Sequence, residues 1–329
     1  MAEKKLLEQV AERVRAMHYS RKTESAYVGW SRRYILFHNK RHPLEMGERE
    51  IEAYLGHLAN VGMVSASTQN QCRAAILFMY REVLGIEIEN VNVMRAKEGK
   101  HLPTVLTKAD TRRVLNCVHG EPYHLIIQLL YGAGLRLSEA QKLRIKDVNF
   151  ESYLLFIRSA KGDKDRTVPL PRILEKPLRD QMEIARRLHE IDVQRGMPGV
   201  YVPFALKRKY SNIGTEWGWF WVFPAENYST DPETKIYRRH HIYESGIQRA
   251  VKTARRESGI ATHVTPHTFR HCCATHMLQD GYSIRVVQEL LGHEDVRTTM
   301  IYTHCMLPAG EAGIVSPLDK MFQADVIRP

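Results

Sequence analysis

Apolar positions recur with a helical period through the first ninety or so residues of the chain. Three stretches predict helices: the N-terminus, "SRKTESAYVGWSRRYILFH" and "STQNQCRAAILFMYREVLG". In the third stretch the spacing i, i+3, i+4, i+7, i+8 produces one apolar stripe, formed by Ile76, Met79, Tyr80, Val83 and Leu84. We therefore expect a small helical domain over residues 1–94.

A second, larger domain is predicted over residues 107–305, after a linker at 95–106 that lacks periodicity and carries Pro103. The stretch "YHLIIQLLYGAG" is apolar nearly all round, as expected of a helix buried in a large core. "YLLFIRSAKGDKDRTVPLP" predicts a strand, a polar turn and a strand, and "ILEKPLRDQMEIARRLHEI" predicts a long helix. An irregular aromatic segment at about 196–225 follows, and the remainder is predicted to be mostly helical. The predicted fold class is α+β, mainly α with a small β-sheet.

Composition and charge narrow the classes of partner. A chain of 329 residues is long enough for two domains. Lys and Arg number 48 against 37 Asp and Glu, a net charge of +11. This excess favours a polyanion, because basic side chains that contact phosphates release condensed counterions; a basic but inert surface is the alternative. The second predicted helix carries a basic group of Arg21, Lys22, Arg32 and Arg33. The absence of a long apolar run or a signal-peptide core predicts a cytoplasmic protein with no membrane partner.

The cysteines and histidines do not predict a metal site. No C-x-x-C pair occurs among the five cysteines, so neither a disulfide framework nor a zinc ribbon is indicated. A dense cluster in "HTFRHCCATH" comprises His267, His271, Cys272, Cys273 and His276. Adjacent cysteines on a helix point about 100° apart, and no second ligand pair follows at a recognisable spacing. We interpret Cys272 and Cys273 as small buried residues.

Two helix starts carry residues with candidate chemistry. In "GAGLRLSEAQKL" the glycines break one helix, and Ser138 with Gln141 has the pattern of a capping box for the next. Arg136 then lies in the bend before that helix, with Glu139 in its first turn. In "TPHTFRHCCATHMLQDG" Thr265 is the predicted N-cap and Pro266 the first helical residue.

The second of these helix starts suits an anion. His267 and Arg270 are three residues apart and share one face of the first turn, where the helix dipole favours negative charge. Farther on, "VVQELLGHEDVRTTMIYTH" has Gly292 as predicted helix C-cap, His293 directly after it and Tyr302 nine residues later. Taken singly, these patterns favour a non-catalytic interpretation: His267 and Arg270 as polar residues satisfied locally, and Tyr302 as a core tyrosine.

Taken together, these residues resemble the catalytic domain of the tyrosine recombinases, or phage integrases. The order and the surrounding sequences "GLRLSE", "AKGDKDRTVPLP", "HTFRH", "LLGH" and "YTH" match that family from about residue 107 to 305. "YSRKTESAYVGW" also resembles the family's helical, SAM-like core-binding domain. The resemblance implies a two-domain clamp on DNA. Its catalytic residues would be Arg136, Lys161, His267, Arg270, His293 and Tyr302.

The resemblance also implies a chemical role for each residue. Arg136 and Arg270 would clamp the non-bridging oxygens of a phosphodiester, which becomes more negative in the transition state. Tyr302 would attack phosphorus and remain on the 3′-phosphate. Lys161 would protonate the leaving 5′-oxygen, with Lys164 as an alternative in the same turn. His267 and His293 would assist proton movement and Glu139 would orient donors. No metal or nucleotide cofactor is implied.

The aromatic segment "GVYVPFALKRKYSNIGTEWGWFWVFPAENY" resembles the additional element of integron integrases. This closer resemblance implies folded single-stranded cassette attachment sites, a duplex attachment site as second DNA and a homotetramer. Extrahelical bases would stack on flat side chains beside cations. The residues implied are Trp219, Pro232, His240 and His241, with Lys207, Arg208 and Lys209. The alternation in "EWGWFWVF" leaves open that some of the rings face the core.

The sequence leaves alternatives open for the docking site of the C-terminal tail and for the class of enzyme. In residues 306–329, Ser316 and Pro317 predict a short helix that docks either in trans on a neighbouring protomer or on its own catalytic domain. A phage- or Xer-type recombinase on duplex sites and a type IB topoisomerase use similar chemistry. A non-catalytic DNA-binding protein would have lost some of the six catalytic residues, and this chain has all of them.

Overall fold

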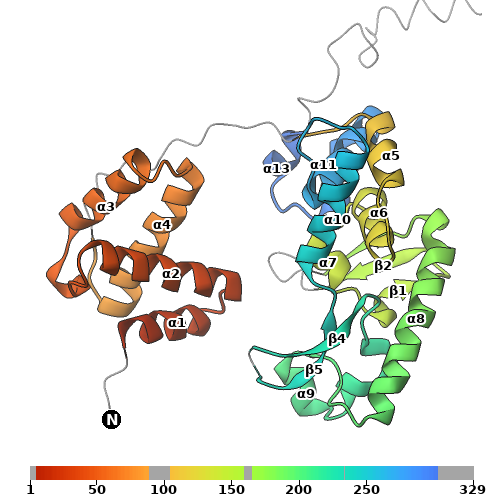
Figure 1. Ribbon diagram of the computed structural model, residues 1–329, viewed down its shortest axis with the longest axis horizontal. Coiled ribbons are helices and arrows are strands. Elements are labelled where there is room, and N and C mark those ends of the chain that lie inside the picture. The colour runs from red at the N-terminus through yellow and green to blue at the C-terminus, as the bar shows by residue number, and fades with distance from the viewer. Residues whose placement is uncertain (1–4, 89–103, 159–164, 233, 303–329) are drawn as a thin grey trace, which may run out of the picture. The chain divides into compact units, whose positions relative to one another are not determined.

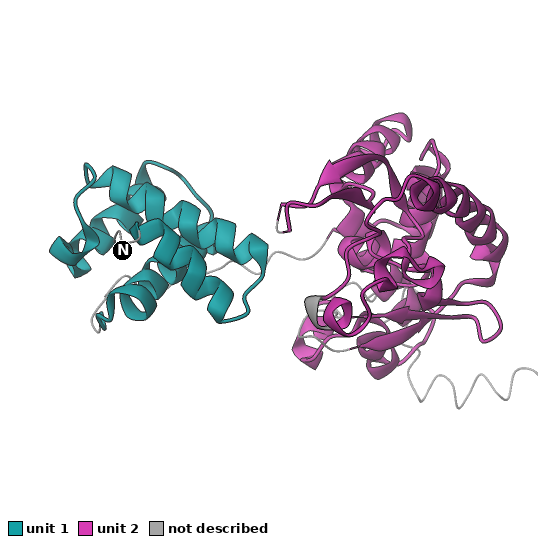
Figure 2. Ribbon diagram, turned by 90° about the horizontal axis from the view of Figure 1, so that it is seen from below, with its two compact units in different colours: residues 1–101 teal, residues 102–329 magenta. Residues whose placement is uncertain are grey.

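The computed structural model describes residues 5–88, 104–158, 165–232 and 234–302. The chain divides into two compact units, Met1–His101 and Leu102–Pro329, which are coloured separately in Figure 2. Within the described residues, no helix combines the length and apolar character that crossing a membrane requires. The mostly helical chain with small sheets confirms the predicted α+β fold class.

The first unit is a helical bundle. Its helices are α1 (Leu6–Ala16), α2 (Arg21–Phe37), α3 (Glu48–Asn60) and α4 (Ala66–Phe78), with a short 3₁₀ turn η1 (Pro43–Glu45) and a π-helical turn η2 (Met79–Leu84). The predicted apolar stripe is confirmed, because Ile76, Met79 and Tyr80 are fully buried and Val83 packs against them. Three helices were predicted for this unit and α3 was not among them, although Ile51 and its helical neighbours are buried in the same core.

The α2 helix combines a buried face with a basic exposed one. Tyr34 is fully buried and its hydroxyl lies 3.0 Å from that of Tyr80. Trp30 is also buried, and the guanidinium of Arg33 lies 4.7 Å from its ring centroid. The four cations predicted from the sequence are all exposed: Arg21, Lys22, Arg32 and Arg33. This unit therefore presents cations from one helix whose opposite side forms the core.

The second unit combines nine described helices with two small sheets (Figure 1). The helices are α5 (Lys108–Asn116), α6 (Tyr123–Gly132), α7 (Leu137–Gln141), α8 (Glu175–Gln194), α9 (Phe204–Lys209), α10 (Glu244–Glu257), α11 (Pro266–Gln279), α12 (Ile284–Leu291) and α13 (Val296–Met300). The strands are β1 (Val148–Asn149), β2 (Leu154–Ile157), β3 (Arg166–Pro169), β4 (Pro224–Thr230) and β5 (Tyr237–His241). Short 3₁₀ turns lie between them: η3 (Ile145–Asp147), η4 (Arg172–Leu174), η5 (Ile213–Thr215) and η6 (Trp217–Trp219).

The predicted strand pair around "AKGDKDR" is β2 and β3, which pair antiparallel, with β1 added at the other edge of β2. Helix α6 is buried as expected: Leu125, Ile126 and Leu130 are all at most 1% exposed and pack in the main core. Leu106, which the sequence analysis placed at the end of the linker, is buried in this core as well.

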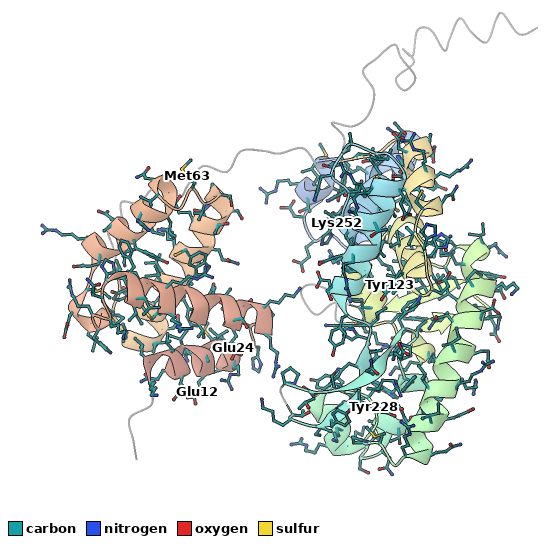
Figure 3. The ribbon with its side chains drawn as sticks, in the orientation of Figure 1. Glu12, Glu24, Met63, Tyr123, Tyr228 and Lys252 are labelled. Carbon is teal, nitrogen blue, oxygen red and sulfur yellow. The ribbon has the colours of Figure 1, made fainter. Side chains whose placement is uncertain are left out.

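The prediction of mostly helical structure after residue 225 is wrong for the first part of that region. β4 and β5 form an antiparallel hairpin there. Arg239 of β5 is 4% exposed and donates two hydrogen bonds to Asp192 of α8, at 2.8 and 2.6 Å. Tyr228 of β4, labelled in Figure 3, donates to the same carboxylate at 2.7 Å. The hairpin is thus attached to α8 through a buried ion pair.

Candidate active site

Arg136, the first candidate catalytic residue along the chain, lies at a bend between α6 and α7. The chain turns at Gly134, whose φ is +62°, and Arg136 becomes the extended N-cap of α7. Its N–H donates to Glu139 Oε2 at 2.8 Å and its guanidinium Nη1 donates to Oε1 at 2.7 Å. The predicted capping box of Ser138 and Gln141 is therefore wrong: the helix starts two residues earlier, with Glu139 at the third helical position. This cap fixes the backbone and side chain of Arg136 together.

Glu139 accepts hydrogen bonds from a second arginine that comes from β3. Arg166 donates Nη1 and Nη2 to the two oxygens of Glu139 at 2.9 and 2.7 Å, and its Nε donates to Leu290 O at 3.2 Å. Burial opposes ionisation of Glu139, but the hydrogen bonds and charge of Arg166, together with Arg136, lower the pKa of the carboxyl to about 2. Glu139 is thus a carboxylate that joins α7 to the β2–β3 hairpin.

Arg270 enters the site from α11. As predicted, Thr265 caps this helix and Pro266 is its first residue, which places Arg270 in the second turn. The guanidinium is buried and donates to the carbonyl oxygens of Gly134 and Leu291. Burial lowers the pKa of Arg270 to about 10, assisted by the nearby charge of Arg136, so the side chain remains cationic at neutral pH.

His293 lies directly after the C-terminus of α12. Gly292, at φ +62°, ends that helix as its predicted left-handed cap. Nε2 of His293 is 3.3 Å from Nη2 of Arg270, and Nδ1 is 2.9 Å from Oγ1 of Thr299. Because a guanidinium can only donate, Nε2 accepts and Nδ1 carries the proton. Burial and the charge of Arg270 lower the pKa of His293 to about 4, so the ring is neutral at pH 7.

Tyr302 lies just beyond α13, which ends at Met300 rather than continuing through the tyrosine. Its side chain is 2% exposed and packs in an apolar cluster with Ala274, Leu278, Val287 and Leu291. The hydroxyl lies 2.9 Å from Nδ1 of His271. The ring is nearly parallel to that of His293, at 16° and 6.4 Å between centroids. The tyrosine ring therefore lies against His293, which was predicted as a site residue, while its hydroxyl contacts His271, which was not.

The structure brings together Arg136, Glu139, Arg270, His293 and Tyr302 of the predicted catalytic set. His267 is exposed in the first turn of α11, and its ring centroid is 6.4 Å from that of His271. Lys161 and Lys164 lie outside the described residues, between β2 and β3.

The electrostatic character of this group is cationic. Burial lowers the pKa of His271 and His293 to about 4, so both rings are neutral at pH 7. The single carboxylate of Glu139 lies among three guanidinia: Arg136, Arg166 and Arg270. Fixed, positively charged donors beside a tyrosine hydroxyl form an environment that stabilises an anion gaining charge during a reaction.

The aromatic segment forms a second group of candidate residues. Phe220, Trp221 and Phe223 are buried, so three of the five rings in "EWGWFWVF" face the core. Trp219 is only half-buried; the ammonium of Lys146 lies 2.9 Å from its ring centroid, and its carbonyl accepts from Arg144 at 2.6 Å. The Arg144 guanidinium is 5.1 Å from the Trp219 ring centroid and 4.0 Å from that of Trp221.

The β4–β5 hairpin adds histidines to this second group. His241 packs edge-on against Trp221 at 5.3 Å, and its Nδ1 donates to Ile242 O at 2.9 Å. His240 precedes it on β5, and its buried Nε2 has no hydrogen-bond partner among the described residues. Burial lowers the pKa of both histidines. Pro232 is exposed between the strands, and Lys207, Arg208 and Lys209 are exposed at the end of α9.

The His/Cys cluster of α11 serves packing and hydrogen bonding. Cys272 and Cys273 are buried as expected, at 0% and 4% exposure. His276 contacts Leu106 O at 2.9 Å and the hydroxyl of Tyr131 at 3.0 Å. In the part of the chain that the structure describes, no three His, Cys, Asp or Glu side chains are arranged to hold a metal ion.

Comparison with known proteins identifies the family. Residues 104–306 match the Phage integrase family, and residues 6–90 match the N-terminal SAM-like domain of phage integrases. A protein from Escherichia coli named "Integrase/recombinase" is 47% identical over 318 residues, which are 96% of this chain and 94% of that protein. The chain belongs to the phage integrase family. It is a tyrosine-type site-specific DNA recombinase, an enzyme that cleaves and rejoins DNA strands.

Other relatives and solved structures agree with this assignment. Tyrosine recombinase XerA from Pyrococcus furiosus is 34% identical over 226 residues, 68% of this chain and 65% of that protein. A phage lambda integrase dimer bound to a COC′ core site has a TM-score of 0.64 at 17% identity, covering 95% of this chain and 98% of that one. XerH bound to a palindromic difH substrate has a TM-score of 0.58 at 20% identity, covering 98% and 83%. These structures share the recombinase fold.

Two residues at the centre of the recombinase site were missed from the sequence. Arg166 binds Glu139, although it lay in the quoted segment "AKGDKDRTVPLP". His271 contacts Tyr302, although its sequence context indicated only membership of the His/Cys cluster for which no metal site is predicted. Their positions in the sequence could have indicated both residues. Arg166 follows the predicted turn that carries Lys161, and His271 directly follows Arg270.

Proposed function

We propose that this recombinase cleaves DNA through a 3′-phosphotyrosyl intermediate on Tyr302. The arrangement of Arg136 and Arg270 around one carboxylate, Glu139, beside the buried tyrosine hydroxyl carries this proposal. The two guanidinia would bind the non-bridging oxygens of the scissile phosphate. The transition state carries more negative charge than the ground state, so fixed cations accelerate the reaction.

The strand-cleavage step conserves bond energy without a cofactor. The oxygen of Tyr302 gives up its proton, which His267 or His293 would take, and forms a bond to phosphorus. The bond from phosphorus to the 5′-oxygen breaks, and Lys161 protonates that oxygen as it leaves. His267 and His293 would bind phosphate oxygens and assist proton movement. Rejoining reverses these steps when the 5′-hydroxyl of another strand attacks the phosphotyrosine.

We further propose that the substrate includes folded single-stranded attachment sites of gene cassettes, as in integron integrases, with a duplex site as second DNA. The aromatic segment supports this proposal because it supplies a half-buried ring, Trp219, with Lys146 against its face. His241 packs on the neighbouring Trp221. A base already outside a helix exposes its π-face, so it stacks on flat side chains next to cations that bind its phosphate.

The base-binding group would comprise Trp219, Pro232, His240 and His241, with the cations of α9 nearby. In Figure 1 the hairpin and α9 lie at the end of the second unit away from α5 and α13. Bases would therefore be recognised at a distance from the scissile phosphate. The exposed cations of α2 would bind DNA phosphates from the first unit.

Assembly into a homotetramer on two DNA segments completes the proposal. The tail, residues 306–329, lies outside the described residues; its sequence predicts a short amphipathic helix that would dock on a neighbouring protomer. The proposed domain plan is a core-binding domain at 1–94, a linker at 95–106 and a catalytic domain at 107–305.

Recombination of ordinary duplex sites is the second candidate function. Relatives named tyrosine recombinase XerA and XerD favour it. Strand transfer with a bottom-strand hairpin, a top-strand hairpin and a perfect duplex, each paired with a duplex partner site, distinguishes the two candidates. An integron integrase will use one hairpin strand much better than the perfect duplex. Equal or better use of the perfect duplex would assign the chain to the Xer or phage type.

A further inference from the structure

The hydroxyl of Tyr302 contacts His271, a residue to which the recombinase reaction as proposed above gives no role. We propose that His271 is a positioning residue for the nucleophile: its imidazole accepts the hydroxyl hydrogen of Tyr302 and so directs the oxygen lone pairs toward the scissile phosphate. This inference rests on the proposed function of Tyr302 as the attacking residue.

The position of His271 on α11 makes this contact possible. Consecutive residues on a helix point about 100° apart, so Arg270 and His271 face different neighbours. Arg270 reaches Gly134, Leu291 and His293. His271 instead faces Tyr302, with ring centroids 5.5 Å apart and an interplanar angle of 48°. One helical turn therefore supplies both a phosphate-binding cation and a group that contacts the nucleophile.

Apolar packing and the contact with His271 act on different parts of Tyr302, the ring and the hydroxyl. Its ring packs among apolar side chains of α11 and α12, which hold the ring without orienting the O–H bond. The residue lies beyond the end of α13, tied to it by its backbone N–H at 3.1 Å from Thr299 O. Both nitrogens of His293 are already engaged with Arg270 and Thr299. His271 is thus placed to fix the hydroxyl in a way that His293 is not.

The protonation state of His271 fits an acceptor. Burial, followed by the proximity of His267 and Arg270, lowers the pKa of His271 to about 4. A neutral imidazole has one acceptor and one donor nitrogen. With Nδ1 accepting from the tyrosine, the lone pairs of the hydroxyl oxygen are left for phosphorus. A protonated ring would donate to that oxygen instead and would occupy the electrons needed for attack.

Replacement by side chains of graded shape tests the proposal. In His271→Asn the amide occupies the position of Nδ1, in His271→Gln it occupies the position of Nε2, and His271→Leu removes both. Single-turnover cleavage of a nicked suicide substrate should fall about tenfold or more in His271→Leu and His271→Gln, and much less in His271→Asn. His276→Asn is the matched control on the same helix; we expect it to lower the melting temperature without changing the cleavage rate.

A substrate with sulfur in place of the bridging 5′-oxygen distinguishes a defect in the nucleophile from a defect in protonation of the leaving group. A thiolate leaves without a proton donor, so the defect of Lys161→Ala should largely disappear, while that of His271→Leu should persist. Cleavage by His271→Leu at the wild-type rate or faster would overturn the proposal, as would recovery of that variant on the sulfur substrate. Equal rates for the Asn and Gln variants would also overturn it, even if the Leu variant failed to fold. Failure of the proposed function itself would appear separately, as a covalent adduct formed by Tyr302→Phe.

Discussion

Replacing Glu139 by glutamine should destabilise the catalytic unit, because this carboxylate offsets the charge of buried guanidinia. Its side chain is 6% exposed and accepts from Arg136 and Arg166 at 2.7 to 2.9 Å. In the folded protein the pKa of Glu139 is lowered to about 2, from the ordinary value of 4.5 for a glutamate. At about 1.4 kcal/mol for each tenfold change in a protonation equilibrium, this corresponds to about 3 kcal/mol of stability at neutral pH. Loss of the counter-charge of a buried pair has a similar cost, about 3–5 kcal/mol.

The sign of the pH dependence follows from the lowered pKa. A carboxyl whose pKa is lower in the folded protein stabilises it above pH 4.5, and this contribution is lost as the pH falls toward 2. The difference in unfolding free energy between wild type and Glu139→Gln should therefore be constant above pH 5 and shrink below pH 4.5. Urea unfolding measures it through tryptophan fluorescence, since three of the four tryptophans lie in the catalytic unit.

An exposed glutamate supplies the control for this measurement. Glu183 on α8 is 65% exposed and 3.7 Å from Arg186, so Glu183→Gln should change stability by less than about 1 kcal/mol, as exposed ion pairs do. A loss below about 1 kcal/mol in Glu139→Gln, or a loss that does not change between pH 5 and pH 2.5, would refute the assignment of Glu139 as the counter-charge of the arginines.

The remaining predictions concern catalysis, recognition and assembly. Alanine at Arg136 or Arg270 should slow cleavage on the order of 10²-fold or more, because a fixed transition-state donor is lost; a single-turnover rate within tenfold of wild type would contradict this. Alanine at Trp219 or His241 should lower hairpin affinity about tenfold, since stacking contributes roughly 1–3 kcal/mol per base, with little change for perfect duplex in the same gel-shift assay. Deletion after Pro308 should preserve DNA binding and weaken the synaptic complex on native gels; undiminished assembly would disprove docking in trans.

Local signals in the sequence were sufficient to predict several parts of the site. Thr265 and Pro266 predicted the start of α11, and Gly292 predicted the left-handed end of α12. These features depend on residues adjacent in sequence, because caps satisfy the free N–H and C=O groups of their own helix end. Arg270 and His293 were therefore correctly located relative to their helices.

Features that depend on distant partners could not be predicted in this way. The β4–β5 hairpin lacks an apolar alternation because buried positions of β5 are arginines, and Arg239 is compensated by Asp192, 47 residues away. Arg166 meets Glu139 across 27 residues. His271 approaches Tyr302 only when α11 and the segment after α13 pack together. Each contact requires the tertiary fold, which periodicity along the chain does not encode.

Covalent capture of DNA is the most direct test of Tyr302 as the nucleophile. A nicked suicide substrate loses its short 5′-hydroxyl fragment after cleavage, so rejoining fails and the protein–DNA adduct accumulates. We predict that the wild-type chain forms an adduct that survives denaturation. Peptide mapping should place its DNA on Tyr302, and Tyr302→Phe should bind the same DNA without forming an adduct. An adduct formed by Tyr302→Phe, or DNA attached to another residue of the wild-type chain, would contradict the account.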